Sequence, residues 1–322
     1  MRELSHLAGV TIGGAAIILT VGGFTLTPAA SGHGTVRPQA AVREWDQQAR
    51  AARQAGVARQ ARAVRLAPGR PMAAHRAGLR PGNPMVRAQG QPSAAPLLGA
   101  NVPEITSTNW AGFAATRPAQ PFRYIQATFF VPYVNCATTP DSFSAHWAGL
   151  DGFDNGTVEQ TGVEADCQGG KASYAAWWEM FPNFAIFPNI VVHPGDSIVA
   201  SVFYRRSTRM FELSLTDTSD GQRFTRVSPC PPGSVCQRSS AEAISEPPAN
   251  GAGTILPLSD FSAESFSGVR VTDQAGNRGT LRSSRWSTLR IVTKSAADGA
   301  ILDQPTQLFQ GMTFANYWMR SS

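Results

Sequence analysis

The stretch Met210-Phe-Glu-Leu-Ser-Leu-Thr-Asp217 decides the fold class of this 322-residue chain. Its apolar residues Phe211, Leu213 and Leu215 alternate with polar ones. Successive side chains of a β-strand point to opposite faces of the sheet. This period of two therefore predicts a strand with one buried and one solvated face.

Further runs of the same kind follow along the chain from Asn101 onward. They are short, rich in aromatic and β-branched residues and separated by turn residues; the clearest are Phe122–Val131, Ser197–Tyr204 and Thr280–Thr293. No long segment there has the 3.6-residue period of a helix. Such spacing over roughly 220 residues is typical of one all-β domain. We predict one all-β antiparallel sandwich or jelly roll over residues 99–322.

The net charge is unevenly distributed along the chain. The whole chain carries +6, but residues 32–98 hold eleven arginines against two acids and carry +9. Residues 99–322 hold 16 basic and 19 acidic residues and carry −3. A nucleic-acid-binding domain has a basic face on its folded body, so we expect no nucleic-acid partner. With 42% hydrophobic and 16% charged residues, the chain is also too apolar to be a disordered protein.

Residues 1–31 have the features of a secretion signal. Arg2 and His6 give a polar start, Leu7–Leu26 is apolar apart from threonines, and small residues follow at 27–31. Such a signal is removed on export, although this apolar run is long enough for a retained membrane anchor. We expect cleavage, and hence a secreted, extracellular protein without stable membrane association.

Residues 32–98 form a basic arm between this signal and the β-rich part. Gln39–Arg65 is rich in Ala, Arg and Gln, which favour a helix, but it has few large apolar residues for a core. Six prolines between Pro68 and Pro96 indicate an extended tether. The arm fits a solvated linker or a propeptide, mostly disordered or helical. We favour a propeptide whose arginines dock on carboxylates at neutral pH and let go when acid protonates them.

The four cysteines agree with export: Cys136, Cys167, Cys230 and Cys236. An even number behind a signal suggests two disulfides, and four cysteines allow three pairings. We favour Cys136–Cys167 and Cys230–Cys236, the second of which closes a short Pro-Pro-Gly loop. The absence of a CxxC pattern argues against a zinc site.

A predicted hairpin over residues 146–163 brings polar residues together. Asn155-Gly156 is a strong signal for a two-residue turn, since both turn positions need positive φ. With that turn, Asp151 lies directly opposite Gln160 and on one face with Trp147. A Gln and an Asp beside a Trp suit a groove on the sheet and, equally, a surface pair.

Five segments of this region, taken together, are more specific than any of them alone. In chain order they are Ser107-Thr-Asn-Trp110-Ala-Gly112, Trp147-Ala-Gly-Leu-Asp151-Gly152, Val158-Glu-Gln160-Thr-Gly162-Val, Tyr174-Ala-Ala-Trp177-Trp-Glu179-Met-Phe-Pro182 and Ser240-Ala-Glu242-Ala-Ile-Ser-Glu246. They resemble, in order, segments of the glutamic peptidases, the eqolisin family. The resemblance implies a double-sheet antiparallel β-sandwich, a jelly roll of the concanavalin A-like type, and secretion as a zymogen. It also implies acid endopeptidase activity on polypeptides that is insensitive to pepstatin and uses no metal or other cofactor.

The resemblance further implies which residues form the site. The catalytic Gln of the family lies in a QTG element, here Gln160, and the catalytic Glu is the second acid of an A-E-x-I-x-E element, here Glu246. The substrate-binding residues of the family correspond to Trp110, Trp147, Asp151, Trp177 and Glu179.

The chain departs from the family pattern in two segments. Ala243 and Ser245 are small where bulkier apolar residues are usual, which could loosen the packing around Glu246. His146 stands where a small or neutral residue is common, which could alter the pH dependence.

A Gln/Glu pair is chemically suited to peptide hydrolysis. The carboxylate of Glu246 can take a proton from water and return it to the leaving amine, while the amide of Gln160 donates to the oxyanion. Neither role needs a neutral histidine, so the pair can work in acid. Asp151, opposite Gln160, is predicted to orient the amide. Glu242 shares a face with Glu246 and is an alternative acid.

Two other functions fit the residues. A secreted glycoside hydrolase needs two carboxylates, which Glu179 and Glu246 could supply. A lectin-like carbohydrate-binding sandwich would stack sugars on Trp110, Trp147 and Trp177. Neither function needs Gln160, whereas the peptidase does. Serine and metallopeptidases fit less well because the chain has no GxSxG or HExxH motif. We expect a monomer.

Overall fold

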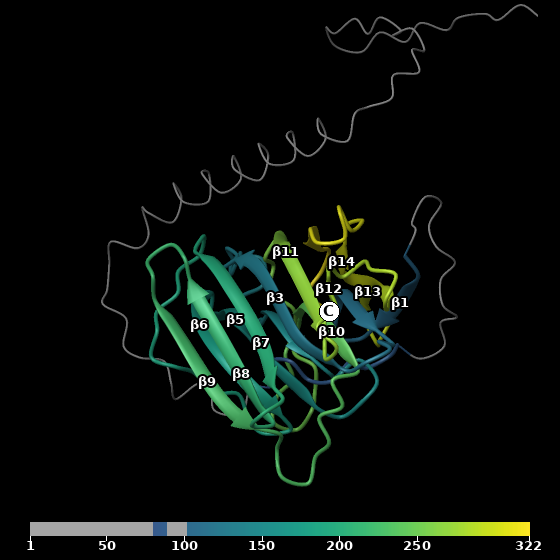
Figure 1. Ribbon diagram of the computed structural model, residues 1–322. Helices are drawn as coiled ribbons and strands as arrows, with labels where there is room; N and C mark the ends of the chain where they lie inside the picture. The colour runs from purple at the N-terminus through teal and green to yellow at the C-terminus, as the bar shows by residue number, and fades with distance from the viewer. Residues whose placement is uncertain (1–79, 89–101) are drawn as a thin grey trace, which may run out of the picture. The chain divides into compact units, whose positions relative to one another are not determined.

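The computed structural model describes residues 80–88 and 102–322, and every regular element in these residues is a β-strand (Figure 1). The predicted signal and most of the basic arm lie outside the described residues. Within the described part, no helix is long and apolar enough to cross a membrane.

Fifteen strands follow one another from residue 104 onward. The first eight are β1 (Glu104–Ser107), β2 (Ala111–Thr116), β3 (Phe122–Phe130), β4 (Ala145–Leu150), β5 (Val158–Gln168), β6 (Lys171–Phe181), β7 (Ser197–Arg205) and β8 (Met210–Asp217). The others are β9 (Arg223–Pro229), β10 (Ser240–Glu246), β11 (Ala263–Asp273), β12 (Arg278–Gly279), β13 (Ser287–Lys294), β14 (Ile301–Pro305) and β15 (Phe314–Trp318). The strands predicted at β3, β7 and β8 are confirmed almost to the residue.

The fourth predicted strand, Thr280–Thr293, is correct only in its second half, β13. The first half, residues 280–286, forms a turn, and two side chains donate hydrogen bonds to the carbonyl oxygen of Leu281 within it. The indole Nε1 of Trp286 donates to the backbone oxygen of Leu281 at 2.8 Å, and Oγ1 of Thr288 donates to the same oxygen at 2.9 Å. Leu281 and Trp286 are therefore buried in this turn although neither belongs to a strand.

The strands form one hydrogen-bonded path in the order β6-β5-β4-β10-β2-β13-β14-β15-β11-β3-β7-β8-β9. The path folds over at β14 and β15, so that β3, β7 and β8 come to face β4, β5 and β10. The chain is thus an all-β antiparallel sandwich, as the alternating sequence predicts.

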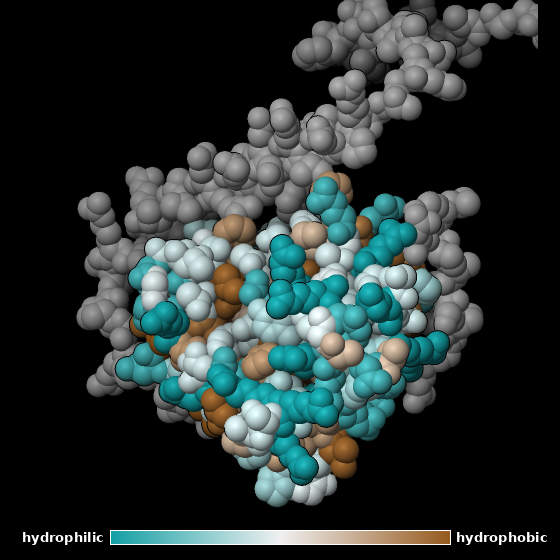
Figure 2. Space-filling model, viewed as in Figure 1, coloured by the Kyte–Doolittle hydropathy of each residue, from teal (hydrophilic) through white to brown (hydrophobic). Residues whose placement is uncertain are grey.

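A large apolar core lies between the two layers of the sandwich. Along β8, Phe211, Leu213 and Leu215 are buried while the residues between them are partly exposed. Ala148 and Leu150 of β4 belong to the same core from the other layer. Figure 2 shows the complementary picture on one outer face, where teal and white side chains outnumber brown ones.

Both favoured disulfides are confirmed. Cys136 is bonded to Cys167 with a Cα–Cα distance of 5.3 Å, and Cys230 to Cys236 with a Cα–Cα distance of 5.9 Å. The first bond ties the segment after β3 to the end of β5.

The predicted register of the β4–β5 hairpin is wrong by two residues. Gly149, and not Asp151, pairs with Gln160, because the loop spans residues 151–157 instead of two. Asn155 organises this longer loop with its side chain: it accepts from the backbone N–H of Gly152 at 3.0 Å and donates to Asp151 at 2.7 Å. A shift of two residues keeps every side chain on its predicted face, so Trp147 and Gln160 still share one.

Candidate active site

Strands β4, β5, β6 and β10 present one face on which the predicted site residues gather. Gln160 of β5 pairs with Gly149 on one side and with Glu179 of β6 on the other. Gly162 likewise stands between Trp147 and Trp177. Glycine is required beside these side chains, since a Cβ on Gly149 would lie 2.9 Å from the Trp147 ring and 3.0 Å from Cβ of Gln160.

Gln160 is held by its neighbour Glu179. Nε2 of Gln160 donates to Oε2 of Glu179 at 2.8 Å, and both residues are fully buried. Burial raises the pKa of Glu179 well above its usual value, the nearby Glu246 raises it further, and the bond from Gln160 opposes the shift. Glu179, predicted as a substrate-binding residue, therefore fixes the direction of the Gln160 amide.

Glu246 ends β10 and is also fully buried. Burial raises the pKa of its carboxyl well above the usual value, against the opposing effect of N–H groups of Gly82, Trp147 and Trp110. An N–H beside a carboxyl favours the ionised form. Glu246 is thus a carboxyl cut off from water, with N–H groups nearby but no hydrogen bond to either of its oxygens in the described residues.

The alternative acid, Glu242, has different neighbours although it shares the face. Its side chain lies by Ser240, and the charges that raise its pKa, after burial, are those of Asp151 and Asp154. Glu179 and Gly82 both lie beside Gln160 and Glu246. The groups that shift the pKa of Glu242 are different ones.

Three tryptophans line the same face. Trp110, Trp147 and Trp177 are all fully buried. The rings of Trp110 and Trp147 meet edge to face, with centroids 5.0 Å apart and planes inclined at 76°. They belong to a second apolar cluster, separate from the core between the layers, which also contains Met85. The predicted Gln160, Glu246 and tryptophans are therefore brought together.

What covers this face is a piece of the basic arm, residues 80–88, here named the strap. At one end, the backbone N–H of Arg80 donates to Ala249 O at 2.8 Å. Further along, the N–H of Met85 donates to Gly152 O at 2.9 Å, and Val86 O accepts from the N–H of Thr108 at 2.8 Å. The strap is bonded to the sandwich along most of its length.

Gly82 of the strap lies on both Gln160 and Glu246. Its carbonyl oxygen accepts from Nε2 of Gln160 at 2.5 Å, and its N–H is the backbone group that lowers the pKa of Glu246. Its φ is +80°, and a Cβ would lie 2.0 Å from the Gln160 amide atoms. Only glycine fits there. No sequence prediction included Gly82. The turn residues Pro81-Gly-Asn-Pro84 are the sequence signal at this point, and they do not show which surface the segment meets.

Asp151 lies apart from this group. Its oxygens accept from the N–H of Arg238 at 2.6 Å, the N–H of Ser239 at 2.8 Å and the side chain of Asn155 at 2.7 Å. The prediction that Asp151 lies opposite Gln160 and orients its amide is wrong, because the longer loop moves it out of register; Glu179 holds the amide instead.

Proteins of similar sequence identify the family of this chain. The profile of the peptidase A4 family matches residues 108–302. The chain belongs to this family. The resemblance to the glutamic peptidases, or eqolisins, is thereby confirmed.

Other peptidase A4 proteins are similar to this chain at a distance. Aspergillopepsin-2 of Aspergillus niger is 27% identical over 196 residues, which are 54% of this chain and 68% of that protein. Scytalido-glutamic peptidase, solved with a transition state analog inhibitor, has a TM-score of 0.56 and 23% identity, covering 66% of this chain and 98% of its own. SCP-B, an eqolisin solved with the tripeptide Ala-Ile-His, has a TM-score of 0.53 at 23% identity, with the same two coverages.

The two departures from the peptidase A4 pattern contact each other. His146 pairs with Ser245 across β4 and β10, and Nδ1 of His146 lies 2.9 Å from Oγ of Ser245. Oγ of Ser245 also accepts from Nδ2 of Asn316 at 2.8 Å. Burial lowers the pKa of His146 to about 3. A neutral polar pair thus lies behind Glu246, on the opposite face of β10.

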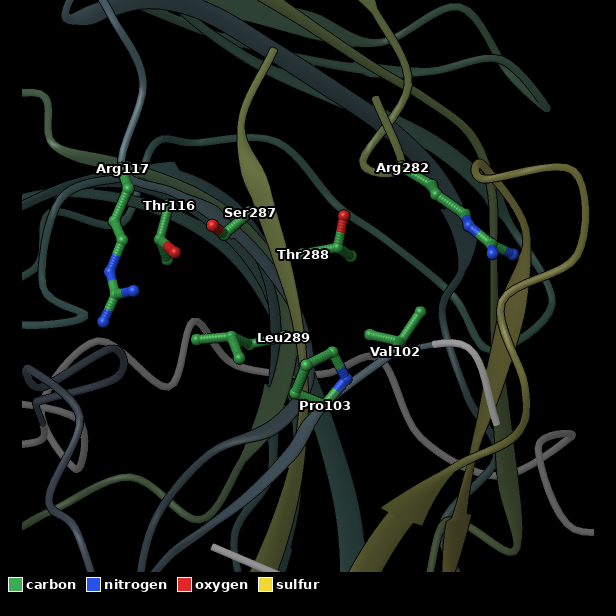
Figure 3. A pocket seen from close by; sticks show the side chains of 8 residues that line it. All are labelled: Val102, Pro103, Thr116, Arg117, Arg282, Ser287, Thr288 and Leu289. Atoms are coloured by element: carbon green, nitrogen blue, oxygen red, sulfur yellow. The ribbon is translucent and has the colours of Figure 1, made fainter. Parts of the chain in front are cut away.

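A separate pocket of about 360 Å³ lies at the far end of β2. Figure 3 shows Arg117 and Arg282 on opposite sides of it, with Ser287, Thr288 and Leu289 of β13 between them. Neither Gln160 nor Glu246 lines this pocket.

Proposed function

We propose that the protein is a secreted, acid-active endopeptidase that hydrolyses polypeptides with Gln160 and Glu246. The observation that carries the proposal is the backbone of Gly82, whose carbonyl accepts from Gln160 and whose N–H lies by Glu246. A face that holds two consecutive peptide groups in this way suits a peptide substrate. The relatives solved with a transition state analog inhibitor and with a tripeptide agree with that substrate class.

The proposed reaction needs water, one carboxylate and one amide. Glu246 takes a proton from water as the water oxygen bonds to the carbonyl carbon of the substrate. Nε2 of Gln160 donates to the oxyanion that develops, and Glu179 keeps that N–H group aimed. The C–N bond then breaks, and Glu246 returns its proton to the amine nitrogen. The products are a carboxylic acid and an amine.

In this proposal the strap must leave before Glu246 can act. Under the strap, burial raises the pKa of Glu246, which favours the protonated carboxyl over the carboxylate that the reaction needs as a base. Once the strap is gone, water reaches the carboxyl and its pKa falls toward the usual range. Gln160 is neutral at any working pH, so activity in acid is set by the ionisation of Glu246.

The basic arm is accordingly proposed to be an inhibitory propeptide. The strap excludes substrate because Gly82 occupies the space beside both Gln160 and Glu246. Met85 of the strap also packs in the apolar cluster that contains the three tryptophans. In the described residues, these contacts are made by backbone and apolar groups and not by arginine–carboxylate pairs. Secretion is proposed from the predicted signal and agrees with the two disulfides.

The proposal is tested by incubating the full-length protein at about pH 3 to 4 and following digestion of an unfolded protein from about pH 2 to 7, with pepstatin and with a chelator. We expect acid proteolysis that resists both reagents. The rival glycoside hydrolase would use Glu179 and Glu246 as its two carboxylates, so the same sample is given soluble polysaccharides. Cleavage of a polysaccharide without proteolysis would replace our proposal with that one.

A further inference from the structure

The second half of the strap is held through its backbone by the corner between β1 and β2. The N–H of Val86 donates to Oδ1 of Asn109 at 2.8 Å, and the carbonyl oxygen of Val86 accepts from the N–H of Thr108 at 2.8 Å. Oγ of Ser107 donates to the same carbonyl oxygen at 2.9 Å. Both polar backbone groups of one strap residue are therefore bound by the sandwich.

The strap is also bonded to the sandwich at each carbonyl on the way to this corner. Nε1 of Trp110 donates to Asn83 O at 2.8 Å, and Nδ2 of Asn109 donates to Pro84 O at 3.2 Å. The corner is reached four residues after Gly82, the residue whose carbonyl accepts from the proposed catalytic amide. The number of residues between that carbonyl and the corner is thus fixed by the contacts on both sides.

The corner is organised by its own hydrogen bonds. Oγ of Ser107 accepts from the N–H groups of Asn109 and Trp110, at 3.2 and 3.1 Å, and so fixes the turn that follows β1. Ser107 and Asn109 are fully buried under the strap. A buried hydroxyl or amide is costly to leave without a partner, and neither group titrates in acid. The corner is therefore suited to bind a peptide backbone at any working pH.

The corner contacts the backbone of the strap and not its side chain. Val86 is 48% exposed, so its side chain adds little to the contact. The next two residues continue as an antiparallel pair: Arg87 forms a bridge with Ser107, and the N–H of Ala88 donates to Thr106 O at 3.3 Å. Main-chain bonds of this kind hold an extended peptide at a sheet edge and supply affinity without selecting side chains.

We propose that Ser107, Thr108 and Asn109 form a substrate subsite that binds the backbone of the fourth residue after the cleaved peptide bond, whatever its side chain. The inference rests on the proposed peptidase function, since it assumes that a substrate runs in the direction of the strap with its reacting carbonyl where that of Gly82 lies. Four extended residues span roughly 13 Å, so the subsite takes a long polypeptide and not a short fragment. Asn109 is a positioning residue in this interpretation.

The test uses the full-length chain after acid activation and four versions of one peptide that is cleaved at a single bond, identified from the masses of its fragments. The first is unmodified and continues for six residues after the bond. Two others carry an N-methyl group on the fourth or on the fifth of these residues, and the last ends after the third. Methylation at the fourth residue removes the donor to Asn109. The fifth is the matched control, because the N–H of Arg87, its counterpart in the strap, donates to no group within the described residues.

We expect N-methylation at the fourth residue to lower kcat/KM about tenfold, chiefly through a higher KM, from the loss of one buried hydrogen bond. The truncated peptide, which loses every bond to the corner, should be at least about tenfold poorer than the unmodified one. Methylation at the fifth residue should change kcat/KM by about twofold or less. In Asn109→Ala the effect of methylation at the fourth residue should also shrink to about twofold or less, because the acceptor is gone. A purely structural role of Asn109 would lower cleavage of both peptides equally.

The outcomes separate the subsite from the peptidase. Equal effects of methylation at the fourth and fifth residues, with cleavage of the unmodified peptide lost in Gln160→Ala, would overturn the subsite and leave the peptidase standing. A full effect of methylation at the fourth residue in folded Asn109→Ala would likewise overturn the subsite. If that variant does not fold, the comparison of the two methylated peptides with the wild type decides alone. No cleavage of any peptide by a sample whose arm has been removed would overturn the proposed function and the subsite with it.

Discussion

Nε2 of Gln160 and Oε2 of Glu179 are joined by a hydrogen bond of 2.8 Å between adjacent strands, inside a fully buried group. The bond leaves the amide of Gln160 one principal direction, toward the carbonyl that Gly82 now presents. Glu179 is in this account a positioning residue for Gln160.

Replacing Glu179 should therefore lower kcat more than it changes KM. Loss of a buried hydrogen bond that aligns the donor to the oxyanion corresponds to a rate that is roughly tenfold lower. We expect Glu179→Ala to show that loss and Glu179→Gln, which keeps an acceptor for Nε2, to show less. Equal kcat in wild type and Glu179→Ala, measured on an unfolded protein in acid, would remove Glu179 from the mechanism.

Gly82→Ala should release the strap. The added Cβ would lie 2.0 Å from the Gln160 amide, and the φ of +80° is unfavourable for alanine. A cost of about 1–2 kcal/mol for the backbone alone corresponds to activation about tenfold faster or more. The rate is followed as the appearance of proteolysis after a shift to acid.

Gly156→Ala is the control for this substitution, because a Cβ there meets nothing within 4 Å. It should activate at the wild-type rate. If Gly82→Ala also activates at the wild-type rate, the strap does not inhibit the enzyme.

The stability of the sandwich should fall as the pH rises from acid toward neutral. Burial raises the pKa well above its usual value in five fully buried carboxyls: Glu159, Glu179, Glu242, Glu246 and Asp303. Between the usual and the raised pKa the folded chain binds more protons than the unfolded one, so the free energy of unfolding decreases with pH. Each such group contributes up to ~1.4 kcal/mol per pH unit.

Glu242→Gln tests this linkage, since glutamine resembles the protonated carboxyl and does not titrate. We expect the midpoint of thermal unfolding to decrease from pH 4 to pH 7 in the wild type and to decrease less steeply in the variant. A midpoint that rises over this range in the wild type would contradict the assignment of buried, protonated carboxyls.

His146 and Ser245 should be energetically coupled. Ser245→Ala leaves Nδ1 of a buried His146 without its partner, at a cost of about 1–3 kcal/mol. In a chain that already carries His146→Phe, the same substitution should cost clearly less. The coupling is obtained from urea unfolding of the two single variants and the double variant; additive costs would mean that the pair acts independently.

The sequence was sufficient to predict the sandwich and the face that Trp147 and Gln160 share, but not the register of β4 and β5. Alternation in Met210–Asp217 and the five ordered segments depend only on local pattern, and the sandwich and family they indicate are confirmed. The register of β4 and β5 depends on where Asn155 places its side chain bonds. Nothing in an Asn-Gly dipeptide distinguishes that loop from a two-residue turn.

The strap could not have been placed from composition either. The high charge of the arm drew attention to its arginines, whereas the decisive contact is a backbone group of Gly82. Whether a Pro-Gly-Asn-Pro segment lies on a sheet or extends into solvent depends on the shape of the surface that it meets. That shape is a property of the folded sandwich alone.

The most direct test of the central claim compares Glu246→Gln with Glu242→Gln and Gln160→Ala in acid-activated protein. Glu242 is the matched control, since it is equally buried on the same strand and face but has Ser240 and Asp151 as neighbours in place of Gly82. Cleavage of an unfolded protein near pH 3 to 4 is measured on samples with the wild-type thermal transition. We predict a loss of at least about 10²-fold in Glu246→Gln and in Gln160→Ala, with Glu242→Gln close to wild type. Full activity in Glu246→Gln, or equal loss in Glu242→Gln, would contradict the account.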